Sequence, residues 1–219
     1  MSVLTWNIEG IRRHRFFLAE ILEQENISLA FLSEPQVYQC DISGIAQYIR
    51  HDYCYALNSD DLYDPELPLS GNIAKGGTMV MWRRSLDPYV KVVEVSSSAF
   101  LPILLTLPGY CPSVHVALYL PTHGQDSEFV SELTNLKNCL DRLMNTHSDL
   151  CMYLRGDGNV NAKNANRVKI FDSFKEQYSL VNTIIGHKTY HHFVGAGKFD
   201  SNVDVILHST SIPGKLLVP

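Results

Sequence analysis

The sequence contains no apolar run that approaches the roughly 18 residues needed to span a bilayer. Its opening, Ser-Val-Leu-Thr-Trp at residues 2–6, also lacks the order of basic, apolar and small residues that marks a secretory signal peptide. These two absences argue against a membrane protein and against export. We therefore expect a soluble, intracellular domain with no membrane partner.

Paired cysteines are also absent. The five cysteines are odd in number, are scattered along the chain and form neither a Cys-x-x-Cys motif nor a Cys/His ligand spacing. This pattern excludes a disulfide framework and a structural zinc site, so the cysteines are expected to be reduced core thiols.

Basic residues are not in excess, since 18 lysines and arginines stand against 23 acidic residues, for a formal charge of -5. Because proteins grip nucleic acid mainly through clustered lysine and arginine, this argues weakly against binding by charge alone. Any affinity for DNA must come from local clusters, each of which could equally be a solvated face. The candidates are Arg12, Arg13 and Arg15, the pair Arg83 and Arg84, and the basic residues within 163–169.

Internal repeats, low-complexity tracts and linkers are missing too, and 45% of the 219 residues are hydrophobic. The chain therefore fits one domain over residues 1–219 with a well-buried core.

Short apolar runs separated by Gly, Pro, Asp and Ser predict many strands, and apolar residues at spacings of three and four predict fewer helices. The class that buries all these runs is α+β, with two packed, mainly antiparallel sheets forming a sandwich flanked by helices. The runs between residues 53 and 120 are expected to be consecutive antiparallel strands. The predicted strands are 3–8, 29–33, 53–57, 78–82, 90–95, 101–107, 114–120, 150–154 and 203–207, and the helices are 11–26, 42–50, 127–145 and 165–176.

Several polar side chains stand directly after an apolar strand or at its end. If these strands lie side by side with their ends on one rim, the side chains form an oxygen-rich pocket of the kind that suits Mg²⁺. Such a metal would neutralise charge on phosphoryl oxygens while a carboxylate orients or deprotonates a water. A plain turn former or helix cap is the alternative for each residue. The set is Asn7, Glu34, Asp157, Asn159, Ser201 and Asp204.

Five short motifs in order resemble those of the endonuclease/exonuclease/phosphatase superfamily. The resemblance covers nearly the whole chain and implies a four-layer sandwich, with Mg²⁺ as the cofactor and Mn²⁺ as a substitute. The motifs are Thr-Trp-Asn-Ile-Glu-Gly at 5–10, Leu-Ser-Glu-Pro at 32–35, Leu-Tyr-Leu-Pro at 118–121, Gly-Asp-Gly-Asn at 156–159 and Ser-Asn-Val-Asp at 201–204.

Two further segments are similar to the endonuclease domains of LINE-type, non-LTR retrotransposons. They are Gly-Gly-Thr-Met-Val-Met-Trp at 76–82 and Thr-Tyr-His-His-Phe at 189–193, which is followed closely by Ser-Asn-Val-Asp. This likeness implies nicking of duplex DNA to leave a 3′-hydroxyl and a 5′-phosphate, inside a polyprotein that carries a reverse transcriptase. It also implies a nuclear location when the protein acts on DNA.

Carried over by motif, Glu34 would be the principal metal ligand, and Asn7 would bind the metal or a phosphate. Asp157 would orient or deprotonate the attacking water, and Asn159 would hold that water or the phosphate. Tyr119 would hydrogen-bond a phosphate oxygen. The alternatives are a solvated acid for Glu34, turn formers for the other three acids and amides, and a packed strand tyrosine for Tyr119.

Ser201 would touch the scissile phosphate, and Asp204 would orient a catalytic histidine. The likeness also assigns DNA contacts to Thr189, Tyr190 and His192, with strand packing as an equal alternative, and Arg12 of the first basic cluster is a further DNA-binding candidate. Adjacent strand residues point to opposite faces, so at most one of His191 and His192 can face the site.

The chain departs from the family pattern in two places. No Ser-Asp-His triplet follows Asp204, and Gly158 replaces an aromatic residue in the Gly-Asp-Phe-Asn motif. The expectation is that the last catalytic strand is missing, which would leave a sheet edge exposed. Two other functions therefore remain open: an impaired or inactive domain that only binds nucleic acid or protein, and a phosphatase of a small phosphoester such as an inositol phosphate.

Overall fold

Two sheets make up the centre of the molecule. The computed structural model describes residues 1–38, 44, 49, 51–59, 76–122, 124–160, 164–183, 190–194, 197–201 and 204–210, with only the backbone described for 190–194 and 197–201. The first half of the chain forms a four-stranded sheet in the order β1-β2-β4-β3, which we call the N-terminal sheet. Its elements are β1 (Ser2–Asn7), α1 (Ile11–Gln24), β2 (Ile27–Ser33), β3 (Tyr53–Asn58) and β4 (Thr78–Arg83).

The second half forms a six-stranded sheet in the order β5-β6-β7-β8-β12-β9, which we call the C-terminal sheet. A 3-10 helix, η2 (Arg84–Tyr89), links the two sheets. The other elements are β5 (Val90–Val92), β6 (Phe100–Leu105), β7 (Ser113–Tyr119), α3 (Asp126–Thr146), β8 (Cys151–Asp157), α4 (Ala165–Gln177), β9 (Leu180–Asn182), β10 (Tyr190–Val194), β11 (Gly197–Ser201) and β12 (Asp204–Ser209).

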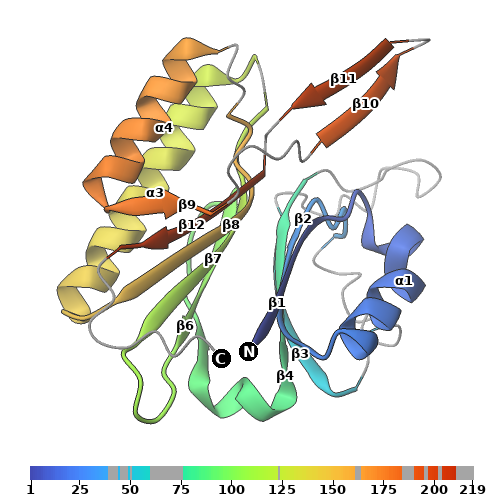
Figure 1. Cartoon of the computed structure of the whole chain (residues 1–219). Helices are drawn as coiled ribbons and strands as arrows, with labels where there is room; N and C mark the ends of the chain where they lie inside the picture. The colour runs from blue at the N-terminus through green and yellow to red at the C-terminus, as the bar shows by residue number, and fades with distance from the viewer. Residues whose placement is uncertain are drawn as a thin grey trace, which may run out of the picture.

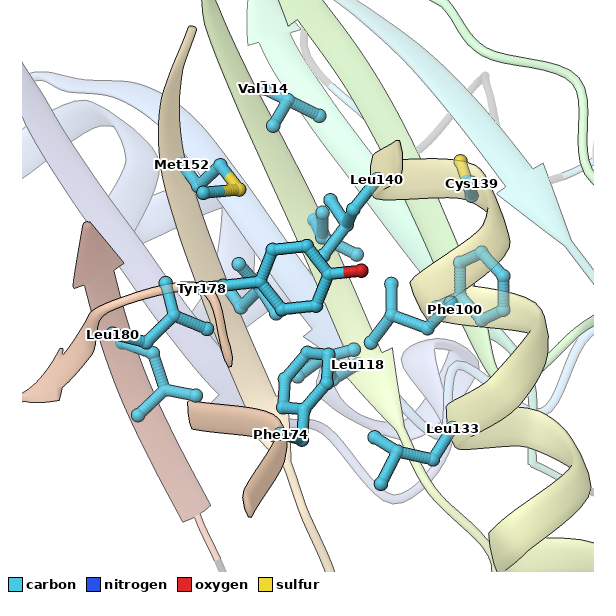
Figure 2. Close-up of a cluster of buried hydrophobic side chains, with 14 of the residues drawn as sticks. Phe100, Val114, Leu118, Leu133, Cys139, Leu140, Met152, Phe174, Tyr178 and Leu180 are labelled. Atoms are coloured by element: carbon cyan, nitrogen blue, oxygen red, sulfur yellow. The ribbon is translucent and has the colours of Figure 1, made fainter. Parts of the chain in front are cut away.

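The layers run helix, sheet, sheet, helix. Figure 1 shows α1 outside the N-terminal sheet and α3 with α4 outside the C-terminal sheet, while the β10–β11 hairpin projects from the sandwich. A separate hydrophobic core fills each of the three interfaces. The largest lies under α3 and α4, where Leu133, Leu140 and Phe174 pack against strand residues such as Leu118 (Figure 2).

Burial on both faces explains the composition of the inner strands. β2 is buried from Leu29 to Ser33 because it lies between α1 on one side and the C-terminal sheet on the other. A strand in that position is expected to be continuously apolar rather than alternating. The parallel neighbours β7 and β8 are of this covered kind, with nearly every residue buried.

The predicted α+β sandwich with helices outside is confirmed, as two mixed sheets. The expected row of consecutive antiparallel strands is wrong at one point, because η2 carries the chain from β4 in one sheet to β5 in the other. β5 also ends at Val92, short of the predicted 95, and the short strand β9 was not predicted. The helix predicted over 42–50 falls mostly outside the described residues.

The arginine pair after β4 has a structural role. Arg83 Nε donates to the Ile27 carbonyl at 2.9 Å, and Arg84 Nε donates to the His51 carbonyl at 3.0 Å. Both residues lie at the end of β4 opposite Thr78. The prediction that they form a local DNA-binding cluster therefore has no support from their contacts.

β1 pairs with β2 alone among the described strands, so it forms an edge of the N-terminal sheet. Its residues from Val3 to Trp6 are only half-buried. Within the described part of the chain, no helix has the length and apolar character needed to cross a membrane.

Candidate active site

The predicted polar residues meet on one rim of the sandwich. Asn7 is the last residue of β1, and Glu34 directly follows β2, its parallel neighbour. Asp157 ends β8 and pairs with both Tyr119 of β7 and Asp204 of β12. Asp204 begins its strand rather than ending one, and it reaches the rim because β12 runs antiparallel to β8.

The Asn7 side chain joins the two sheets at this rim. Its Nδ2 donates to Glu34 Oε1 at 2.9 Å and to Asp157 Oδ2 at 3.3 Å. The first carboxylate belongs to the N-terminal sheet and the second to the C-terminal sheet. One amide therefore holds together two carboxylates that lie 123 residues apart in the sequence.

The sheets approach closely beneath the rim. Ser33 Oγ donates to the Leu118 carbonyl at 2.8 Å across the gap. Gly156 has a φ of +133°, and a Cβ there would lie 2.2 Å from the Leu118 carbonyl oxygen and 2.9 Å from Ser33 Oγ. Only glycine fits, because a side chain would push the two halves of the site apart.

Both residues that follow the central strands have left-handed backbones. Glu34 has a φ of 51° and Asn159 has a φ of 48°. The Glu34 amide donates to the Gly77 carbonyl at 3.0 Å, and its carbonyl accepts from the Gly10 amide at 2.9 Å. Non-glycine residues held in this region cost about 1–3 kcal/mol each and cluster at functional sites.

Asp157 is only 5% exposed, and burial raises the pKa of its carboxyl to about 7. The hydrogen bond from the Asn159 amide and that from Asn7 act against this shift, while the nearby acids Asp204 and Glu34 raise the pKa further. The carboxyl is therefore poised to gain or lose a proton near neutral pH.

Tyr119 points its hydroxyl into the same acidic group. Burial first, and then Glu34 and Asp157, raise the pKa of this phenol well above its ordinary value, and a hydrogen bond to Glu34 adds to the shift. Gly76 makes room for the ring, because a Cβ at Gly76 would lie 2.8 Å from it. Tyr119 therefore stays a neutral hydrogen-bond donor.

The donor set suits a hard, well-hydrated cation. Within the described residues no three His, Cys, Asp or Glu side chains gather as a ready-made cage. Mg²⁺ does not need one, since it commonly takes one or two carboxylates and keeps several waters. Glu34 could supply the carboxylate, with Asp157 bound to the same Asn7 amide. Asn7 presents its nitrogen to both acids and could bind metal only after its amide turned over.

Comparison with known proteins rests on structure alone, because no family model and no curated protein matches the chain. The endonuclease domain of TRAS1, a telomere-specific non-LTR retrotransposon, aligns with a TM-score of 0.67 at 13% identity, covering 95% of this chain and 84% of that domain. The chain has the endonuclease/exonuclease/phosphatase fold. The resemblance predicted from its motifs is thus confirmed for the fold.

Two further neighbours share this endonuclease/exonuclease/phosphatase fold. The AP endonuclease LMAP from Leishmania major has a TM-score of 0.69 at 14% identity, with 95% of this chain and 78% of that chain covered. TDP2 from D. rerio, solved with a single-stranded DNA product, has a TM-score of 0.63 at 16% identity, with 98% and 86% covered.

The remaining predicted residues divide into two groups. Arg12 is exposed in the first turn of α1, two residues after Gly10, whose amide binds the Glu34 carbonyl. Tyr190 and His192 lie on β10 and Ser201 on β11, where only the backbone is described, and Thr189 lies outside the described residues. Their DNA and phosphate contacts stay predictions.

The histidine partner predicted for Asp204 is not supplied by His208. His208 pairs with Tyr153 farther down β12, and its Nδ1 contacts the Ser209 carbonyl. Sequence reasoning also missed Ser33 and Gly156, which bring the sheets together. A glycine directly before Asp157, at the end of an apolar strand, was the available signal for close backbone approach.

Proposed function

We propose that this chain is a Mg²⁺-dependent phosphodiester hydrolase that nicks duplex DNA and leaves a 3′-hydroxyl and a 5′-phosphate. The observation that carries the proposal is the Glu34–Asn7–Asp157 arrangement, in which one amide links carboxylates of both sheets at the rim. Glu34 contributes to the raised pKa of the Asp157 carboxyl, and a cation beside these two acids would relieve that repulsion.

Each residue then has a distinct role. Asp157 accepts a proton from the attacking water, and a pKa of about 7 suits a general base at neutral pH. Glu34 would hold Mg²⁺, or Mn²⁺ in its place, and the ion would supply charge neutralisation at the phosphoryl oxygens. Tyr119 donates its hydrogen bond to a phosphate oxygen, and Asn159 fixes the position of the water or the phosphate.

DNA as the substrate is supported by the neighbours and by the surface beside the rim. The neighbours include a retrotransposon endonuclease domain, an AP endonuclease and a 3′ phosphatase from Neisseria bound to a product DNA hairpin. On this chain, exposed Arg12 and Arg13 stand at the start of α1 beside the site. The same reading implies a link to a reverse-transcriptase polyprotein and action in the nucleus.

One observation favours a second function, that of an impaired domain which binds DNA without cutting it. His208 does not serve as the histidine partner of Asp204, because it pairs with Tyr153 and its Nδ1 contacts the Ser209 carbonyl. A phosphatase of inositol phosphates is less favoured, because the groups that shift the pKa of Asp157 and Tyr119 are acids and amides and include no lysine or arginine.

The test is nicking of supercoiled plasmid with Mg²⁺ or Mn²⁺, followed by DNA ligase. We expect the chain to nick, the ligase to reseal the product, and EDTA or Asp157→Asn to abolish the reaction. Asp172→Asn is the matched control, because this acid lies on the outer surface of α4 and pairs with Lys175. Tight DNA binding without nicking in either metal would instead establish the binding-only function.

A further inference from the structure

Arg167 of α4 is the largest of the fully buried side chains, at 1% exposure. It belongs to none of the motifs that mark the site, and its burial contradicts its prediction as a DNA-binding residue of the basic cluster within 163–169. An arginine carries five N–H donors and is almost never buried unless those donors find acceptors. Its partners therefore show what it is for.

The guanidinium binds two chain segments that leave neighbouring strands. Nη1 donates to the Pro121 carbonyl at 2.7 Å and to the Asn159 carbonyl at 3.3 Å. Nη2 donates to the Thr122 carbonyl at 2.6 Å. The first segment follows Tyr119 of β7, and the second follows Asp157 of β8.

The Arg167 side chain is itself fixed from two directions. Nε donates to Asp126 Oδ1 at 2.6 Å, although the Asp126 side chain is 55% exposed and its charge is partly screened. The guanidinium carbon lies 4.6 Å from the centre of the Phe129 ring. Both partners belong to the first turn of α3, so the Arg167 guanidinium is held against a rigid helix.

Asn159 depends on these segments for its geometry. Its Nδ2 donates to the Leu120 carbonyl at 2.7 Å, and its amide donates to Asp157 Oδ1 at 2.9 Å. Its left-handed backbone must be held against strain. Arg167 binds the Asn159 carbonyl and also the two carbonyls that follow Leu120, so it fixes both ends of the Asn159–Leu120 bond.

We propose that Arg167 is a positioning residue for the reaction, which sets the Asn159 carboxamide and the segment after Tyr119 through this three-carbonyl fork. Its catalytic consequence rests on the proposed nuclease function, whereas its hold on Asn159 does not. A lysine could not reproduce the fork, because its ammonium is a point charge that cannot bridge diverging carbonyls in one plane.

The experiment compares Arg167→Lys with Phe174→Leu. Phe174 is 2% exposed on the same helix and packs against Phe171 and Tyr178, so its truncation costs stability without touching the fork. Assays are run well below the Tm of both variants. We expect Arg167→Lys to lower kcat by about 10- to 100-fold with KM unchanged, and Phe174→Leu to keep the kcat of the unsubstituted chain.

Amide hydrogen exchange, followed by NMR at Asn159 and Gln125, gives a second readout that needs no activity. The first amide donates to Asp157 Oδ1 and the second to the Thr122 carbonyl. Arg167→Lys is expected to speed exchange at both amides, and Phe174→Leu is not. If the two variants match in exchange and in kcat, Arg167 is an ordinary packing residue and the proposal fails. An unsubstituted chain that does not nick defeats the nuclease proposal alone, because the exchange comparison still decides the role of Arg167.

Discussion

Glycines at the rim set how closely the reactive side chains can approach one another. Gly76 has a φ of +61° and faces the Tyr119 ring, while Gly109 has a φ of +80° with no heavy atom within 4 Å of its Cβ position. The two positions thus share a left-handed backbone but differ in their surroundings. They form a natural pair of test sites.

Gly76→Ala is predicted to cost more stability than Gly109→Ala and to displace Tyr119. Both substitutions add backbone strain of about 1–2 kcal/mol, but at Gly76 the new methyl group would also meet the ring at 2.8 Å. Urea unfolding measures the difference, and nicking assays should show loss only for Gly76→Ala. Equal unfolding free energies for the two variants would show that the ring moves aside without cost.

A second polar group lies away from the rim, between the sheets. His115 is 2% exposed, accepts from Arg155 at Nδ1 and contacts Ser113 through Nε2. Its ring stacks between Phe31 and Tyr153. Burial, and then the Arg155 cation, lower the pKa of His115 to about 3.

This buried histidine is predicted to make the fold sensitive to acid. The unfolded chain protonates His115 below its ordinary pKa of 6.5, whereas the folded chain keeps it neutral down to about 3. The contribution of His115 to the free energy of unfolding is therefore fully present above pH 6.5. Below that pH it falls by about 1.4 kcal/mol per pH unit. Urea unfolding at several pH values between 7.5 and 5 measures this effect. The free energy of unfolding should fall less steeply with decreasing pH in His115→Gln than in the unsubstituted chain, and an equal fall in both would contradict the prediction.

The start of helix α1 presents exposed basic residues beside the candidate site. Its first turn follows Gly10, and Arg12 and Arg13 are exposed there, with exposed Phe16 one turn later. Basic residues next to a cleavage site act on binding through released counterions rather than on the chemical step.

The variant with Arg12→Ala and Arg13→Ala is predicted to bind duplex DNA more weakly at an unchanged kcat. The slope of log affinity against log salt should fall by about 0.9 for each phosphate contact removed. Fluorescence anisotropy at several salt concentrations measures it. Lys91→Ala is the matched control, because Lys91 is an exposed cation on the edge strand β5. An equal change in DNA affinity and salt dependence in this variant would show that the effect comes from net charge and not from a contact with α1.

The sequence predicted most elements, and it predicted that Asn7, Glu34 and Asp157 converge if their strands end on one rim. That condition holds because β1 with β2 and β7 with β8 are parallel pairs, whose carboxyl ends meet at the same edge. The sequence could not predict the change of sheet at η2, since the runs before and after it carry the same alternation and turn signals. The structural role of Arg167 could not be predicted for a different reason. Three of its acceptors are backbone carbonyls, two of them more than forty residues away, and backbone carbonyls leave no trace in a sequence.

At the scale of the whole molecule, the candidate site is built from residues of both sheets. Glu34 and Asn7 belong to the N-terminal sheet, and Tyr119, Asp157 and Asp204 belong to the C-terminal sheet. A cation held by Glu34 beside Asp157 would be attracted to acids of both sheets and would oppose the separation of these sheets, so metal binding and global stability should be coupled.

Mg²⁺ is therefore predicted to stabilise the folded chain and to lose this effect in Glu34→Gln. At a hundred times the dissociation constant the gain in unfolding free energy is about 2.7 kcal/mol. Thermal unfolding with increasing Mg²⁺, against matched ionic strength in NaCl, measures it. A Tm that rises equally in Glu34→Gln would place the ion elsewhere.

The order of the strands along the chain also matters. Every strand of the N-terminal sheet precedes Arg84, every strand of the C-terminal sheet follows Tyr89, and η2 lies at the end of β4 opposite the rim. A cut within η2 would give two fragments, each with its own helix-backed core but only half of the reactive groups. Neither fragment alone would then be active, and activity would require that the two fragments associate.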